Sequence, residues 1–206
     1  MKSLFPTLLH EFTIPDFAAE RDSLIEYCYN EFKADQKGRN KSNRGKGWQS
    51  QDHYCVFENP LNTTLTKVLR HFLLETDIFE KGTEMACQAM WININYPGSY
   101  NIKHDHPNSD LSGVFWIKAG ADNMGELIFD DPFSYSRFQE GVCYSIDYQK
   151  RHGLCKSYNV TPQEGELVIF PSNLQHSVDI NNSNEERISV SFNLKLDIDF
   201  NSANIR

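Results

Sequence analysis

The sequence lacks several features that would place it at once in a familiar class of protein. No apolar run approaches the ~18 residues that a membrane-spanning helix needs. The apolar run at the N-terminus is too short for a signal peptide and is interrupted by Pro6. Positive charge is also scarce, because 20 Lys and Arg residues stand against 28 Asp and Glu residues, for a net charge of −8. We therefore expect no membrane insertion and no affinity for nucleic acids, whose phosphates require an excess of cations.

The cysteines lack the spacing of a disulfide framework or of a zinc site. They number five, which is odd, and no two of them form a CxxC pair. The positions are Cys28, Cys55, Cys87, Cys143 and Cys155. We interpret them as reduced thiols and expect a soluble, cytoplasmic protein.

The chain does contain a helical start followed by many short strands. Apolar residues at helical spacing predict one helix after Asp16, its expected N-cap, and a second after Asn59-Pro60. From Met85 onward the pattern changes to short alternating runs separated by turn residues. The expected strands cover residues 86–96, 100–106, 111–118, 125–130, 141–148, 165–170, 174–179 and 187–196.

This order of elements predicts a mainly β fold with N-terminal helices, a β-sandwich or jelly roll, since crossover helices for a parallel sheet are missing. We expect one domain over residues 1–206, with helical support in 1–80 and the jelly-roll core in 85–196. Between the two helices lies a basic segment, residues 37–47, with five cations and three glycines. It is either a solvated mobile loop or a flap that faces a substrate.

Three histidines form a candidate metal site. Side chains at positions i and i+2 of a strand share a face, so His104 and His106 point the same way and Asp105 points the opposite way. The third ligand must come from a distant segment, and His176 is the best candidate because it follows an apolar strand and a turn. Three ligands on one side of an ion leave open positions, which suits a catalytic metal.

The strand 187–196 carries a second signal. Arg187 and Ser189 fall on its polar face, opposite an apolar face. That polar face either lies in water or points into the barrel, where an arginine fork and a hydroxyl would bind a carboxylate. On earlier strands, Asn93 either helps to bind a cosubstrate or satisfies backbone groups, and Trp116 is a further candidate for cosubstrate binding.

Together these motifs resemble the 2-oxoglutarate and Fe(II)-dependent oxygenase superfamily. The likeness is greatest to its small bacterial and phage members, which share an HxHP…SGvyY…DP…FPs…HsV…RiSisfN pattern. The matching residues lie between 86 and 196 and are His104, His106, Pro107, Ser112-Gly113, Asp131-Pro132, Phe170-Pro171-Ser172, His176-Ser177-Val178 and Arg187-Ile188-Ser189.

The resemblance implies a double-stranded β-helix, a cupin-like barrel, with Fe(II) as the metal and 2-oxoglutarate as cosubstrate. By the same likeness, Arg187 and Ser189 would hold the distal carboxylate of 2-oxoglutarate. The usual ligand set of the superfamily is HxD…H, so His106 stands where an aspartate is expected. Asp110 or Asp131 would supply a carboxylate only if a loop folds back.

The segment 133–161 departs from the pattern and is interpreted as an inserted hairpin that carries specificity or a partner contact. We expect a dioxygenase that hydroxylates an unidentified substrate, a protein side chain or a small molecule, while converting 2-oxoglutarate to succinate. Two alternatives stay open. One is a cupin-like three-histidine metalloenzyme that does not use 2-oxoglutarate, and the other is a non-enzymatic β-sandwich that binds carbohydrate or protein. The oligomeric state is also open.

Overall fold

The computed structural model describes residues 6–52, 54–55, 58–120, 122–133 and 143–198. The helices are α1 (Phe17–Ala34), α2 (Pro60–Leu74) and α4 (Ile146–His152). The strands are β1 (His10–Thr13), β2 (Asn43–Arg44), β3 (Trp48–Gln49), β4 (Thr83–Asn95), β5 (Tyr100–His104), β6 (Leu111–Lys118), β7 (Leu127–Asp130), β8 (Ser157–Val160), β9 (Glu166–Pro171), β10 (His176–Val178) and β11 (Arg187–Ile198). Among the described residues, no helix has the length and apolar character that crossing a membrane would require.

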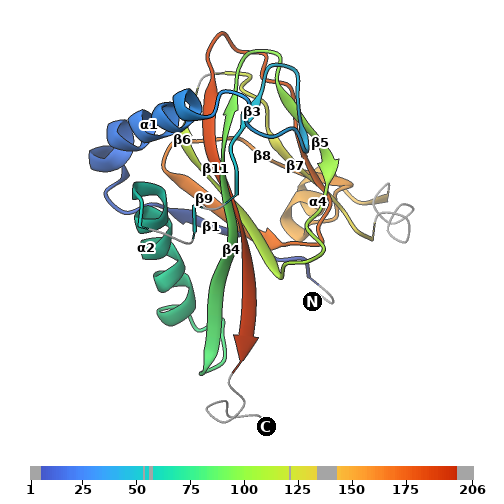
Figure 1. Cartoon of the computed structure of the whole chain (residues 1–206). Helices are drawn as coiled ribbons and strands as arrows, with labels where there is room; N and C mark the ends of the chain where they lie inside the picture. Colours follow the sequence, from blue (N-terminus) through green and yellow to red (C-terminus); the bar gives the residue numbers. More distant parts are fainter. Residues whose placement is uncertain (1–5, 53, 56–57, 121, 134–142, 199–206) are drawn as a thin grey trace.

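The strands form two antiparallel sheets, and α1 and α2 lie beside the larger one (Figure 1). The six-stranded sheet has the order β1-β9-β6-β11-β4-β3, and the five-stranded sheet has the order β2-β5-β10-β7-β8. Neighbours in these sheets are mostly distant in sequence, as in a jelly roll. The prediction of a mainly β fold with N-terminal helices is therefore confirmed.

Strand β6 shows how the larger sheet serves two cores. Phe115 and Ile117 pack in the core that the sheet shares with the helices, where Leu24 and Phe72 are buried. Their neighbour Trp116 points the other way, into a second core between the two sheets. Because successive side chains of a strand point to opposite faces, the larger sheet is buried on both faces. One face packs against the helices and the other faces the smaller sheet.

Both predicted helices are present. α2 is capped as the sequence predicts, since the Asn59 Oδ1 atom accepts a hydrogen bond from the Asn62 amide at 3.0 Å. Asp16 precedes α1 but adopts a left-handed conformation (φ 55°, ψ 21°), and its side chain makes no capping hydrogen bond. The start of α1 therefore depends on packing rather than on a cap.

Two strand predictions are wrong in part. The predicted strand 141–148 overlaps α4, which has Ser145 as its N-cap and Gly153 (φ 62°) as its C-cap. These start and stop signals outweigh the short alternating run. The strand predicted to reach residue 106 ends at His104. There the chain leaves the sheet, and the His106 amide donates to the carbonyl of Ser172 at 2.8 Å.

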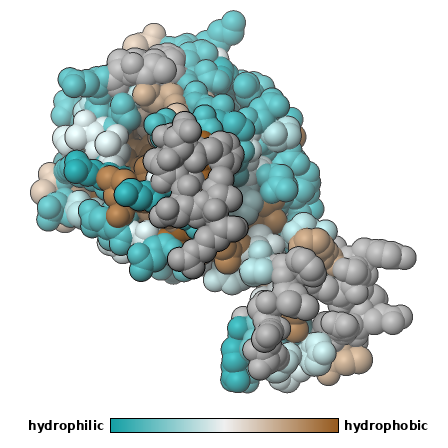
Figure 2. Space-filling model, turned by 90° about the horizontal axis from the view of Figure 1, so that it is seen from below, coloured by the Kyte–Doolittle hydropathy of each residue, from teal (hydrophilic) through white to brown (hydrophobic). Residues whose placement is uncertain are grey.

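The segment predicted as an inserted hairpin, 133–161, lies partly outside the described residues, at 134–142. Its described part holds α4 and β8, and β8 pairs with β7 of the five-stranded sheet. The region around α4 lies at the side of the sandwich in Figure 1 and projects from the body in Figure 2.

The basic segment 37–47 is hydrogen-bonded to both sheets. Its strand β2 pairs with β5, and the following β3 pairs with β4 in the other sheet. The Arg39 amide donates to the carbonyl of Gln49 at 2.7 Å, and the Ile102 amide donates to the carbonyl of Ser42 at 3.0 Å. The segment thus closes one edge of the sandwich.

Gly113 allows two strands and a side chain of the larger sheet to approach closely. A Cβ atom there would lie 2.2 Å from Phe192 Cζ and 2.7 Å from the carbonyl oxygen of Val168.

We predict that Gly113→Ala lowers the free energy of unfolding by about 1–3 kcal/mol, the usual cost of overpacking. Urea unfolding measures this. Gly47→Ala is the matched control, because its Cβ would meet only an ordinary contact at 3.4 Å. Equal midpoints for the two variants would contradict the prediction.

Candidate metal centre

The fold makes His104 and His176 direct cross-strand neighbours. His104 ends β5 and His176 begins β10, and the two residues are paired in the register of these strands. Their ring centroids are 4.4 Å apart. His176 is buried, with 5% exposed, and His104 is partly buried.

His106 completes the group from outside the strand. Its ring centroid is 5.1 Å from that of His104 and 5.3 Å from that of His176. One ligand nitrogen from each of the three rings lies within 4.8 Å of the others. Among the described His, Cys, Asp and Glu residues, this is the one group of three or more with such spacing. The structure thus brings together the three predicted residues, and their role as metal ligands stays a prediction.

Two of the rings are held in the tautomer that a metal needs. The Nδ1 atom of His104 lies 2.7 Å from the carbonyl of Ile102, and that of His176 lies 2.8 Å from the carbonyl of Leu174. A carbonyl only accepts hydrogen bonds, so Nδ1 carries the proton in both rings. The Nε2 lone pairs are left for an ion, and the backbone fixes the ring orientation.

Burial keeps the three rings neutral. It lowers the pKa of His106 to about 3 and that of His176 to about 4, and it also lowers the pKa of His104. Neighbouring imidazoles add to the effect at His106 and His176, since two adjacent positive rings would repel each other. Neutral imidazole is the form that binds a metal.

The two aspartates considered as carboxylate ligands are engaged elsewhere. Asp110 pairs with Lys195 at 3.0 Å and accepts a hydrogen bond from the Leu196 amide at 2.8 Å. Asp131 accepts from the Phe133 amide at 2.9 Å. Neither belongs to the histidine group.

An inner cavity beside the histidines contains a buried arginine. Arg187 is 2% exposed, and its Nη1 atom donates to the carbonyls of Met124 at 2.6 Å and Gly125 at 2.5 Å. Its Nε atom is buried without a partner. None of the described residues that line the cavity is acidic. Burial lowers the pKa of Arg187 to about 10, and an arginine still holds its charge near neutral pH.

A buried cation without a counterion is costly, so this cavity suits an anionic ligand. Of the other predicted cosubstrate residues, Ser189 lies opposite Asn93 on β4 and Trp116 on β6, and all three line the cavity with Arg187. The Asn93 Nδ2 atom donates to Ser191 Oγ at 3.0 Å, while its Oδ1 atom is buried without a partner. At Arg187 and Ser189 the polar face of β11 therefore points into the sandwich and not into water.

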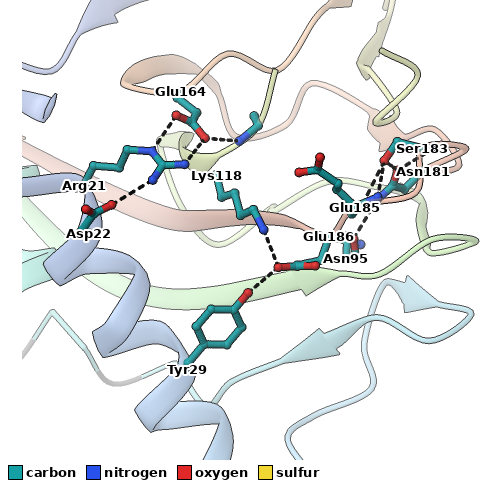
Figure 3. A network of polar contacts seen from close by, with 11 residues as sticks. Arg21, Asp22, Tyr29, Asn95, Lys118, Glu164, Asn181, Ser183, Glu185 and Glu186 are labelled. Atoms are coloured by element: carbon teal, nitrogen blue, oxygen red, sulfur yellow. Dashed lines mark hydrogen bonds and ion pairs between the residues drawn. The ribbon is translucent and has the colours of Figure 1, made fainter. Parts of the chain in front are cut away.

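A polar network anchors the chain immediately before Arg187 (Figure 3). The carboxylate of Glu186 accepts hydrogen bonds from the Tyr29 hydroxyl on α1 and from Lys118 Nζ on β6. Nearby, Asn181 Nδ2 donates to the carbonyls of Asn95 at 2.9 Å and Glu185 at 2.8 Å. These contacts fix the start of β11 and hence the position of the guanidinium.

An outer groove adjoins the other side of the histidine group. It is lined by Trp91 and Ile102 and by residues of the basic segment, among them Arg39 and Lys41. An ion pair of 2.6 Å joins Arg39 to Asp52 within it. The sequence indicated this groove only through the substrate-facing interpretation of residues 37–47.

Sequence reasoning missed other site residues. Asn95 and Ser191 line the inner cavity, and strand parity with Asn93 and Ser189 would have found them. The two carbonyls that hold Arg187 are backbone atoms, which no side-chain motif reports.

The fold and the site together define the class of protein. It is a double-stranded β-helix with a three-histidine cluster beside a buried arginine whose Nε atom has no hydrogen-bond partner. Residues 89–193, about half of the chain, match the family described as "Putative 2OG-Fe(II) oxygenase". The chain belongs to this family. It is therefore a 2-oxoglutarate-dependent iron oxygenase, with Fe(II) and 2-oxoglutarate as cofactors. Membership of this family argues against the two alternatives, a metalloenzyme without 2-oxoglutarate and a non-enzymatic module.

Solved structures share the fold at low identity. A prolyl-4-hydroxylase of Pseudomonas putida is 15% identical with a TM-score of 0.61, and 92% of each chain is covered. A viral collagen prolyl hydroxylase from Paramecium bursaria Chlorella virus-1 is 16% identical with a TM-score of 0.57, covering 90% of this chain and 94% of that one. HygX from Streptomyces hygroscopicus, with nickel and 2-oxoglutarate bound, is 10% identical with a TM-score of 0.59, covering 92% and 83%. No curated protein sequence matches the chain.

We predict that His176→Ala weakens Co(II) binding by more than about 100-fold, since loss of even an outer-shell partner costs up to that factor. His71→Ala is the control, because His71 lies on α2 and pairs with Glu75 on the exposed surface. Anaerobic titration followed by visible absorption of Co(II) measures both affinities. Unchanged Co(II) affinity in the His176 variant would contradict the site.

Proposed function

We propose that this chain is an Fe(II)/2-oxoglutarate dioxygenase that hydroxylates a C–H bond of its substrate while 2-oxoglutarate is decarboxylated to succinate. The observation that carries the proposal is the Nε atom of Arg187, which is buried without a partner in the cavity that the three histidines border. A carboxylate placed there would supply both a counterion and a hydrogen-bond acceptor.

The proposed ligands of the ion are His104, His106 and His176. Bound iron would supply the activation of O₂, which the protein side chains cannot perform themselves. The backbone carbonyls at the Nδ1 atoms of His104 and His176 hold those two rings in place before the ion binds, so little reorganisation is needed.

The inner cavity is the proposed site of the cosubstrate. Arg187 and Ser189 would bind its distal carboxylate, with the guanidinium kept in position by the carbonyls of Met124 and Gly125. The Oδ1 atom of Asn93, buried without a hydrogen-bond partner, belongs to the lining of the same cavity, where a bound water would donate to it. The indole of Trp116, 3% exposed, closes the cavity against solvent.

The outer groove is the proposed site of the substrate. His104 and His106 line both the groove and the inner cavity, so an ion held by them is reached from both sides. A substrate in the groove would thus present its C–H bond to the open side of the ion. The basic segment 37–47 forms one wall, which agrees with the flap interpretation of that segment.

We predict that Arg187→Met weakens 2-oxoglutarate binding by about 30-fold or more, because removing one partner of a buried charged pair costs roughly 2–5 kcal/mol. Arg187→Lys should give an intermediate loss, since lysine keeps the charge but not the planar fork. The measurement is anaerobic titration of the Fe(II)-loaded protein with 2-oxoglutarate, followed by the visible charge-transfer band.

The matched control is Arg21→Met, because Arg21 pairs with Glu164 near the surface, away from the cavity. Co(II) binding by each variant shows that its histidine group is intact. A charge-transfer band that is absent in the unmodified protein, or that titrates equally in the Arg187 and Arg21 variants, would refute the proposed function.

A further inference from the structure

The histidine group and the inner cavity together lack negative charge. The three proposed ligands are neutral imidazoles, and no acidic residue lines the inner cavity in the described part of the chain. With a divalent ion bound, the ion and Arg187 would place three positive charges in one buried region. Uncompensated charges in a region of low dielectric are strongly unfavourable.

The remaining aspartates near the histidines lie outside the histidine group and do not line the inner cavity. Asp105 accepts a hydrogen bond from Gln175 Nε2 at 2.9 Å. Asp130 pairs with Lys103 at 2.5 Å. Asp52, in the outer groove, pairs with Arg39. Asp130 and Asp52 are therefore paired with cations of their own, whereas Asp105, bonded to a neutral amide, keeps its charge at the border of the outer groove.

We infer that the metal ion and 2-oxoglutarate bind this chain as a strongly coupled pair, and that His106 sets the strength of the coupling. This inference rests on the proposed function. An aspartate at position 106 would cancel one positive charge before the cosubstrate arrives. With histidine there, no proposed ligand of the ion is charged, so the cosubstrate dianion has to supply more of the negative charge and each ligand gains more from the presence of the other.

Coupling between two ligands is reciprocal, so 2-oxoglutarate raises the affinity for the metal by the same factor as the metal raises the affinity for 2-oxoglutarate. The chain would therefore hold its metal weakly when the cosubstrate is scarce and retain it when the cosubstrate is abundant. The availability of 2-oxoglutarate would control not only turnover but also metal loading.

The position of His106 allows a clean test by substitution. Its backbone is fixed independently of the side chain, because its amide donates to the Ser172 carbonyl and its carbonyl accepts from the Ser109 amide. The ring is partly buried, with Trp91 as a neighbour at 5.7 Å between centroids. Asp and Asn are smaller than His and nearly identical to each other in shape. His106→Asp and His106→Asn therefore differ in charge alone.

The experiment measures the dissociation constant of Mn(II) with and without saturating 2-oxoglutarate, with free Mn(II) determined by electron paramagnetic resonance. For the unmodified protein we expect 2-oxoglutarate to tighten Mn(II) binding by a factor in the upper part of the usual range of about 5- to 150-fold. His106→Asp should bind Mn(II) more tightly than the unmodified protein without 2-oxoglutarate and show a factor several-fold smaller. His106→Asn should not gain Mn(II) affinity, and its factor should stay large.

Equal factors for the unmodified protein and His106→Asp would overturn the inference, as would identical behaviour of the Asp and Asn variants. If the Asp variant does not fold, as judged by circular dichroism, the unmodified protein still decides. In that case 2-oxopentanoate, a monoanion of the same chain length, must tighten Mn(II) binding several-fold less than 2-oxoglutarate, and an equal effect overturns the inference.

Failure of the inference is distinguishable from failure of the proposed function. If the unmodified protein forms the charge-transfer band with Fe(II) and 2-oxoglutarate but the factors are equal, only the role of His106 is wrong. If no band forms and Mn(II) has no effect on 2-oxoglutarate binding, the proposed function itself is wrong.

Discussion

The site depends on one buried charge, the guanidinium of Arg187. Removing such a group from water is costly, and the fold compensates only in part, through the carbonyls of Met124 and Gly125. Gly125 (φ 83°) is required for this arrangement, because a Cβ atom there would lie 2.2 Å from the carbonyl oxygen of Asp179. The unpartnered Nε atom leaves part of the cost for a ligand to offset. A chain that keeps this feature gives up stability for affinity toward an anion.

The two sheets carry different parts of the site. The five-stranded sheet positions His104 and His176, and the six-stranded sheet positions Arg187 and Ser189 on β11. The separation of the metal ligands from the anion-binding group is thus the separation of two packed sheets, which side-chain motion alone cannot alter. The helices reinforce this geometry from outside, since Tyr29 of α1 bonds to Glu186 directly before Arg187.

Strand parity predicted much of this arrangement and failed where strands end. It placed Arg187 and Ser189 on one face of their strand, because β11 is long and regular. It extended β5 as far as His106, although the chain has already turned toward Ser172 there, and it missed short strands such as β2 and β3 whose pairing depends on distant partners. Hydrogen bonds to backbone carbonyls and the walls of the outer groove arise only from tertiary structure, so local patterns could not reveal them.

The most direct test is an anaerobic crystal structure of the protein with Fe(II) and 2-oxoglutarate. We predict iron bonded to one nitrogen each of His104, His106 and His176, with no side-chain carboxylate among its ligands. The distal carboxylate of 2-oxoglutarate should lie within hydrogen-bond distance of Arg187 Nε and Ser189 Oγ. An aspartate bound to iron in place of His106, or a cosubstrate carboxylate bound away from Arg187, would contradict the account.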